Sequence, residues 1–186
     1  MNHSTSVLRV FALVFLFVAA PIVRSQETKK PLTDAELIAA AREIMATARY
    51  CALITSDSSG RAQARTVDPF SPDEHMRVWL ATNPRTRKVR EIRRRPRVTL
   101  YYFDRESQAY VTIHGRARLV NDPKEKAKRW KDEWKEFYPD RQKDYLLIVV
   151  TPVRLEVVNV SKGILGDPQT WKPPSVTFPI FVKVTK

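Results

Sequence analysis

The residues with the clearest chemical potential in this chain are Thr86, Arg87 and Lys88, which follow one another directly. They follow residues 78–82, an apolar segment typical of a strand, and begin a basic segment that predicts a helix ending before Pro96. The hydroxyl of Thr86 can cap such a helix, and the remaining N–H groups then face outward at the positive end of the helix dipole. Together with the two cations, these donors predict a phosphate site. A capped surface helix with solvated charges is the alternative interpretation.

The charge of the chain is strongly positive, at +13, with 33 lysines and arginines against 20 acidic residues. Such a surplus attracts anions, and nucleic acid, an anionic membrane face and a phosphorylated small molecule all satisfy it. The 4 glycines are not spaced as a dinucleotide fingerprint or a P-loop, which excludes Rossmann and Walker-type phosphate sites. The single cysteine, Cys51, excludes an internal disulfide and lies in an apolar segment, where a free thiol is usually buried. His75 and His114 have no metal-site spacing, so no metal is expected.

Residues 1–25 have the features of a signal peptide. Arg9 precedes the apolar run 10–20, which is too short to span a bilayer as a stable helix. Val23 and Ser25 occupy the positions that a signal peptidase reads. We therefore expect cleavage after Ser25, export to the periplasm or the medium, and no stable membrane span once the segment is removed. An uncleaved membrane anchor is the alternative interpretation.

The order of the expected elements favours an antiparallel β-barrel with peripheral helices. Strands come in runs without βαβ units, and helices are expected before the first strand, in the middle of the chain and before the last pair of strands. The barrel domain is expected at residues 32–160, followed by an irregular C-terminal arm, residues 161–186, whose last stretch (176–184) alternates like an edge strand. The expected strands are residues 51–55, 61–67, 76–82, 97–103, 108–120, 145–150 and 153–158, the last two hinged at Pro152, and the expected helices begin at Thr33, Thr86 and Asp122, the third running to Pro139.

One segment resembles the phosphate motif of a known family. Residues 80–88, Leu-Ala-Thr-Asn-Pro-Arg-Thr-Arg-Lys, match a motif in which Thr-Asn is followed after two residues by Ser/Thr-Arg-Lys. The chain thereby resembles the pyridoxamine 5′-phosphate oxidase-like split barrels, and within them the general stress protein 26-type branch. The resemblance implies a six-stranded antiparallel split β-barrel that forms homodimers, with FMN bound in clefts at the subunit interface. Four further segments occur in the order of that family: residues 60–65, 95–98, 110–115 and 146–156.

The resemblance also implies roles for individual residues. It places Thr82 near the flavin ring. Thr86, Arg87 and Lys88 would hold the FMN phosphate, and Arg65 corresponds to an arginine that reaches the same phosphate from the opposite side. Two or three cations beside a helix N-terminus suit a dianionic phosphate. The implied cofactor is FMN, with F420 or haem as alternatives, because the wider superfamily also binds these acids.

The chain departs from the oxidase itself at several positions. Phe70 stands where the oxidase has a lysine, Tyr110 where it has a glutamine, and Val157–Val158 replaces an aromatic residue. The expected function is therefore an exported FMN-binding oxidoreductase of unknown substrate rather than a true pyridoxamine phosphate oxidase, and no catalytic acid or base can be named. The alternative is a non-catalytic split-barrel protein that binds a flavin, F420, haem or a bilin. Nucleic acid is less favoured, because the basic residues 88–97 lack interleaved aromatic side chains that stack on bases.

Overall fold

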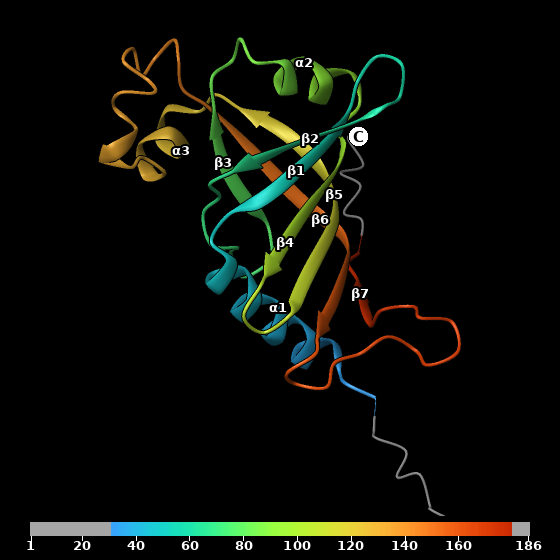
Figure 1. The fold of residues 1–186 in the computed structure, drawn as a ribbon. Helices are drawn as coiled ribbons and strands as arrows, with labels where there is room; N and C mark the ends of the chain where they lie inside the picture. The colour runs from blue at the N-terminus through green and yellow to red at the C-terminus, as the bar shows by residue number, and fades with distance from the viewer. Residues whose placement is uncertain (1–30, 180–186) are drawn as a thin grey trace, which may run out of the picture. The chain divides into compact units, whose positions relative to one another are not determined.

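Seven strands and three α-helices make up residues 31–179, the part of the chain that the computed structural model describes. The expected signal peptide, residues 1–25, and the last residues, 180–186, lie outside this part. Among the helices of residues 31–179, none is long and apolar enough to cross a membrane. In chain order (Figure 1), the elements are α1 (Asp34–Ala48), β1 (Cys51–Ser56), β2 (Ala62–Val67), β3 (Val78–Thr82), α2 (Arg87–Arg94), β4 (Arg97–Asp104), β5 (Ala109–Val120), α3 (Pro123–Lys128), the short 3-10 helix η1 (Asp132–Trp134), β6 (Leu146–Asn159) and β7 (Ser175–Thr177).

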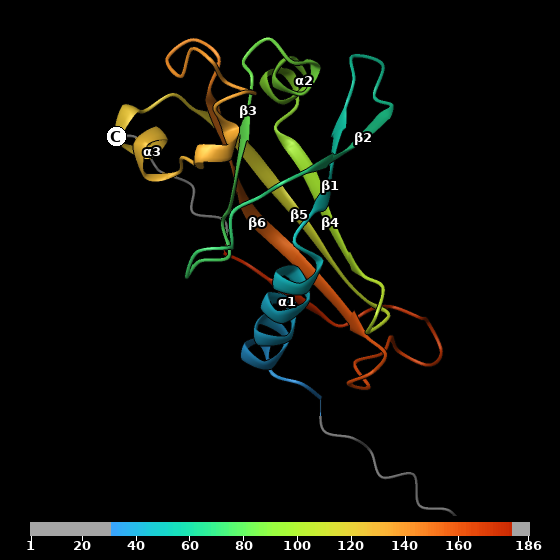
Figure 2. The same ribbon diagram turned by 60° about the vertical axis from the view of Figure 1, so that its left-hand side comes forward.

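The strands form one antiparallel sheet in the order β2-β1-β4-β5-β6-β3, and β7 pairs with β6 beside this path. The two end strands, β2 and β3, are joined within the described residues only near a bridge between Pro69 and Leu80. There Phe70 N donates to Trp79 O at 2.8 Å. Beyond this bridge the two strands diverge toward α2 (Figure 2), so the barrel is split along one side. The expected six-stranded antiparallel split barrel is confirmed, and β7 adds a seventh strand to its sheet.

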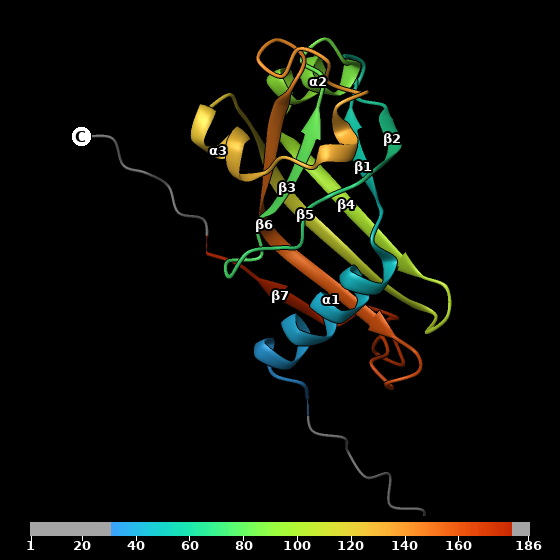
Figure 3. The ribbon, with the colours of Figure 1, turned by 90° about the vertical axis from the view of Figure 1, so that its left-hand side faces the viewer.

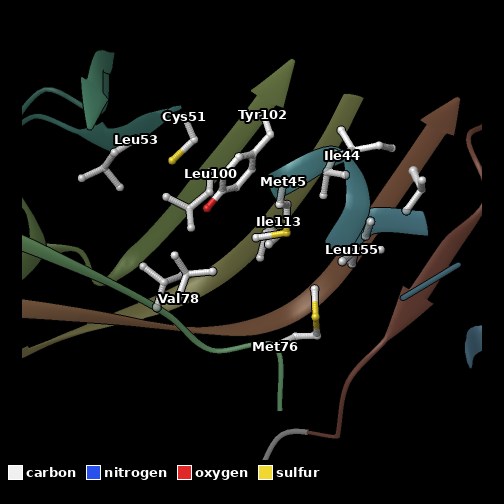
Figure 4. Close-up of a cluster of buried hydrophobic side chains, with 14 of the residues drawn as sticks. Ile44, Met45, Cys51, Leu53, Met76, Val78, Leu100, Tyr102, Ile113 and Leu155 are labelled. Atoms are coloured by element: carbon white, nitrogen blue, oxygen red, sulfur yellow. The ribbon is translucent and has the colours of Figure 1, made fainter. Parts of the chain in front are cut away.

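Helix α1 lies against one end of the barrel, near β7 (Figure 3). A capping box begins it: Glu36 N donates to Thr33 Oγ1, and Thr33 N donates to Glu36 Oε2. Its apolar face points into the barrel, where Ile44 and Met45 join the cluster that also holds Cys51 (Figure 4). Cys51 is 3% exposed, which confirms the expectation that its thiol is buried.

The chain between β5 and β6 differs from the long helix that was expected there. Helix α3 ends at Lys128, and only the short η1 follows before Pro139. The bend between them lets Trp130 and Trp134 both pack on Tyr145, with ring centroids 5.3 and 6.1 Å from its ring. The prediction of one continuous helix was therefore wrong, because folding the chain back buries two indoles in a second apolar cluster beside the barrel core.

Strand β6 runs through Pro152 as one continuous strand, where two strands hinged at this proline were expected. The ladder accommodates the proline by a register shift, since His114 pairs with Arg154 but Gly115 pairs with Pro152. A Cβ at Gly115 would lie 2.6 Å from Thr151 O. The two strands therefore pass too closely at the bulge for any side chain, which explains the glycine.

The C-terminal arm lies on its own barrel as far as the structure describes it. Strand β7 pairs antiparallel with residues 154–156 of β6, and Val176 is 3% exposed. Phe178 packs against the same core, and its N donates to Val153 O at 2.9 Å. The edge strand expected at residues 176–184 is thus present at its start, and its last residues lie outside the described part.

Candidate phosphate site

Polar and cationic side chains gather at the open end of the split, where β3 ends and α2 begins. Figure 1 shows α2 across the end of β3 and beside the β1–β2 hairpin, and α2 contacts β1 directly. Arg65 on β2 pairs with Leu53 on β1, and directly paired residues share a face of the sheet. Because Leu53 is fully buried, Arg65 extends along the inner face toward α2. The register of the hairpin thus turns this cation away from the outer surface.

The turn from β3 to α2 is held by Asn83 and Arg85. Asn83 Oδ1 accepts from Arg85 N at 2.9 Å, an Asx turn that favours a tight reversal. Arg85 Nη2 donates to Asp144 Oδ1 at 2.9 Å, and Asp144 is a largely buried residue just before β6. These two contacts fix the turn to the sheet and so fix where α2 starts.

Thr86 occupies the N-cap position of α2, as expected, but its hydroxyl does not cap the helix. Its Oγ1 donates to Asn83 O at 2.8 Å and lies 3.1 Å from Thr82 Oγ1. The predicted cap was therefore wrong, because a carbonyl of the turn takes the hydroxyl proton. Val89 N donates to Thr86 O at 3.2 Å, but the N–H groups of Arg87 and Lys88 before it receive nothing from the Thr86 hydroxyl, which leaves these two for an anion.

Lys88 points back toward the same turn, and its Nζ donates to Thr82 Oγ1 at 3.1 Å. Thr82 is 2% exposed, so its hydroxyl supports the ammonium group from inside the protein. Burial lowers the pKa of Lys88, and the nearby guanidinium of Arg65 lowers it further, whereas Glu91 raises it. Two cations near enough for one to lower the pKa of the other favour an anion between or beside them.

Sequence reasoning missed two residues of this group, Glu91 and Thr55. Glu91 on α2 is 5% exposed, and its Oε2 accepts from Arg65 Nη2 at 2.9 Å and from Thr55 Oγ1 at 2.5 Å. Arg65 Nη1 also donates to Thr55 Oγ1 at 2.5 Å. On the other side, Arg87 Nε lies 3.2 Å from Glu91 Oε1. The four-residue spacing of Arg87 and Glu91 on a predicted helix was the signal that could have revealed the ion pair.

The structure therefore brings all five predicted site residues to the same end of the barrel, in two neighbouring sets. Thr82 lies within hydrogen-bond distance of Thr86 and Lys88, and Glu91 forms ion pairs with Arg65 and Arg87. The predicted roles of these residues in holding a ligand stay predictions. We call the group the Arg65–Lys88 cluster, and it consists of Thr55, Arg65, Thr82, Thr86, Arg87, Lys88 and Glu91.

The outer face of the sheet carries an open cavity of about 820 Å³, walled mainly by β1, β4 and β5. It shares Thr55 with the Arg65–Lys88 cluster. His114 lines it, with Nδ1 3.1 Å from Thr99 Oγ1. The exposed rings of Tyr101 and Phe103 continue this face along β4, because alternate residues of a strand point to the same side.

Residues 31–179 contain no group of three or more His, Cys, Asp or Glu side chains that could hold a metal ion.

Comparison with known protein families shows to which family this chain belongs. A family model described as pyridoxamine 5′-phosphate oxidase like matches residues 36–162, well over half of the chain. The chain belongs to the pyridoxamine 5′-phosphate oxidase-like family. A search of curated protein sequences found no significant match.

Solved structures share the fold of this family member. A general stress protein 26-related protein from Clostridium acetobutylicum superposes with a TM-score of 0.63 at 19% identity, covering 80% of this chain and 97% of its own. An FMN-binding protein related to pyridoxamine 5′-phosphate oxidase, from Nostoc punctiforme, reaches 0.58 at 15% identity, with coverage of 75% and 91%. A haem-binding protein from Mycobacterium smegmatis reaches 0.56 at 20% identity, with coverage of 74% and 56%. At these identities the likeness shows the fold alone.

Two positions at which this member departs from the oxidase pattern carry packed aromatic rings. Phe70 meets Trp134 edge-on, with ring centroids 5.5 Å apart, and Lys131 Nζ lies 5.1 Å from the Phe70 centroid. Tyr110 lies beside Tyr101 on the outer face, with centroids 5.7 Å apart. Aromatic contacts therefore occupy both positions at which the chain is expected to depart from the oxidase.

Proposed function

We propose that this chain is an exported FMN-binding oxidoreductase that holds the FMN phosphate at the split of its barrel. The observation that carries the proposal is the placement of two cations beside the start of α2. Lys88 Nζ is held by Thr82 Oγ1 at 3.1 Å, and Arg65 Nη2 is held by Glu91 Oε2 at 2.9 Å. A phosphate monoester carries about −1.5 to −2 charges at neutral pH and accepts several hydrogen bonds. Two cations and the first N–H groups of a helix supply donors of the kind it needs. The residues present therefore fit the phosphate of FMN.

The residues of the cluster have different parts in this proposal. Lys88 and Arg65 contact the phosphate, and Thr82 orients the ammonium of Lys88. Thr86 fixes the turn by its hydrogen bond to Asn83 O, so its hydroxyl does not occupy the first N–H groups of α2. Arg87, whose side chain is 61% exposed, adds positive charge at the mouth of the site. Bound FMN would supply the hydride or electron transfer, while the protein supplies binding and electrostatics.

A ligand carrier without turnover is the second candidate function, with haem or F420 in place of FMN. His114 favours haem, because it lines the 820 Å³ cavity and its Nδ1 faces Thr99, so Nε2 would be left to bind the haem iron. F420 is acidic and would use the same cations as FMN.

We further propose that the chain forms a homodimer through the outer face of β4 and β5. Phe103 is 54% exposed there and Tyr101 is 36% exposed, next to the ring of Tyr110. An exposed aromatic group on a sheet face favours burial by a second copy. The export part of the proposal rests on residues 1–25 of the sequence.

A spectral titration of the purified full chain tests the proposal. FMN, F420 and haem are added in turn, and we expect the absorption bands of FMN to shift and its fluorescence to change on binding. Uptake of haem or F420 alone would favour the carrier, and uptake of none would contradict both functions. Bleaching of the bound flavin by a nicotinamide donor would then separate an oxidoreductase from a carrier.

A further inference from the structure

Glu91 is the single acidic residue of α2, in a segment that otherwise carries five lysines and arginines. It is 5% exposed, so its carboxylate has lost most of its hydration. A buried carboxylate is costly unless cations and hydrogen-bond donors compensate it. The groups that compensate Glu91 are residues of the proposed phosphate site.

The contacts of Glu91 fix one edge of Arg65. Arg65 Nη2 donates to Glu91 Oε2 at 2.9 Å, and Thr55 Oγ1 donates to the same oxygen at 2.5 Å. Arg65 Nη1 donates to Thr55 Oγ1 at 2.5 Å and to Leu53 O at 3.4 Å. Both terminal nitrogens are therefore anchored on the protein side, while 18% of the Arg65 side chain stays exposed. A guanidinium held by one edge can present its remaining N–H groups to an anion.

Glu91 also sets the charge of the cluster. Burial and the charge of Arg65 lower the pKa of Lys88, and Glu91 acts in the opposite direction. When Arg87 is included, three cations and one carboxylate leave two net positive charges. This matches a phosphate monoester, which carries about two negative charges above its second pKa.

We infer that Glu91 is a positioning residue that orients Arg65 toward the ligand and sets the charge of the cluster for a phosphate monoester dianion. The inference rests on the proposed function, because it concerns the same site. It narrows the ligand class, since a singly charged phosphate diester or carboxylate would leave positive charge uncompensated. The alternative is that Glu91 competes with the ligand for Arg65 as an internal anion, and this alternative predicts the opposite effect on affinity.

The affinities of the full chain for FMN, riboflavin and inorganic phosphate test the inference. Glu91→Gln keeps an acceptor for Arg65 but removes the charge, and it should weaken FMN binding about 10-fold. Glu91→Ala also removes the acceptor and should weaken it about 100-fold. Riboflavin lacks the phosphate, so it should bind these variants as it binds the wild type. Glu133→Gln removes an exposed acid elsewhere and should leave the FMN affinity unchanged.

The effect should depend on Arg65, which distinguishes positioning from general support of the fold. In an Arg65→Gln background, Glu91→Gln should weaken FMN binding clearly less than in the wild type, because the arginine that Glu91 orients is gone and only the charge of Glu91 still acts. Thr55→Val removes the second anchor of Arg65 without changing a charge, and it should also weaken FMN binding. Additive losses in the double variant would overturn the inference. An FMN affinity that is unchanged or higher in Glu91→Gln would do so as well.

These outcomes can be separated from a failure of the proposed function. If the wild type binds phosphate but not FMN, the proposed function fails, and the same variants test Glu91 with inorganic phosphate as the probe. If the wild type binds neither, both proposals are contradicted. Circular dichroism shows whether each variant is folded, and if Glu91→Ala is not, Glu91→Gln and Thr55→Val decide the question.

Discussion

Lys88 Nζ donates a hydrogen bond to Thr82 Oγ1 at 3.1 Å, across the turn between β3 and α2. Thr82 lies at the end of a strand and is 2% exposed, so the ammonium is held by a group that belongs to the rigid barrel. The position of the ammonium group is therefore set before a ligand binds. This reduces the side-chain entropy that is lost on binding.

As pH rises, the affinity for FMN should begin to fall at a lower pH than it would if Lys88 had the pKa of an ordinary lysine. Burial and Arg65 lower the pKa of Lys88, so the free site loses this charge below the ordinary value of about 10.4. Because the phosphate is a dianion above about pH 6, affinity should be highest near neutral pH and fall as pH rises through the Lys88 pKa. Fluorescence titrations from about pH 7 up to the ordinary lysine value of about 10.4 check this. Lys88→Arg stays charged throughout, so an equal decline in that variant would contradict the prediction.

Removing Arg87 and Lys88 together should abolish FMN retention and leave the fold intact. The hydrogen bond from charged Lys88 contributes about 1.5–3 kcal/mol, and the charge of Arg87 adds to it, so the loss of both should lower affinity by roughly 100-fold or more. Equilibrium dialysis measures the retention, and circular dichroism checks the fold. Arg93→Ala with Arg94→Ala removes the same charge from the other end of α2 and is the matched control. Comparable FMN affinity in the two double variants would show that the site has been assigned wrongly.

The thiol of Cys51 should be inert in the folded protein. Burial raises its pKa to about 12, and the thiolate is the reactive form. At pH 8 we expect a disulfide reagent to label it at least about 100 times more slowly in buffer than in denaturing urea. Absorbance of the released thiol reagent follows the reaction. Rapid labelling without urea would mean that β1 opens at its first residue.

Gly115→Ala should destabilise the barrel without affecting the cations of the site. The added Cβ would meet Thr151 O at 2.6 Å and Val150 Cγ1 at 2.7 Å, so the bulge would have to shift. Overpacking of this kind costs about 1–3 kcal/mol of unfolding free energy. Urea denaturation measures it, with the exposed neighbour Arg116→Ala as a control that should stay within about 0.5 kcal/mol of wild type.

Phe103→Glu should convert the proposed homodimer into a monomer. The ring of Phe103 is 54% exposed on the outer face, where a second copy would cover it. A glutamate at this position would have to bury its charge in the interface, which is costly. Light scattering after gel filtration measures the mass. Phe137 is 70% exposed in the segment after η1, so Phe137→Glu makes the same change outside the proposed interface and should stay dimeric. A dimeric Phe103→Glu protein would exclude this face as the interface.

Parts of the site could be predicted from the sequence because they depend on residues close together in the chain. The order of Thr82, Asn83 and Thr86 predicts a strand end, a turn and a helix start, and the structure has each at that place. Backbone preferences and short-range hydrogen bonds determine such features. Even here the donor–acceptor pairing of the Thr86 hydroxyl was not predicted, because several acceptors lie within its reach.

The fold class also followed from local patterns, but the exact paths of two segments did not. Strand patterning and the family resemblance predicted the antiparallel split barrel, which the sheet order confirms. The expected long helix before β6 ends early at Lys128, because Trp130 and Trp134 gain more by packing on Tyr145 than by continuing a helix. Burial against distant residues overrides local helix preference in this case.

The sequence by itself determined that two cations follow a strand and begin a basic helix, and that an arginine lies on an earlier hairpin. Only the tertiary structure decided that Arg65 meets Glu91 and that its charge lowers the pKa of Lys88, since the Arg65–Glu91 contact joins residues 26 positions apart. It depends on the register that pairs Arg65 with Leu53 and on the packing of α2 against β1. A shift of one residue in that register would turn Arg65 to the other face, so the site exists only in the assembled barrel.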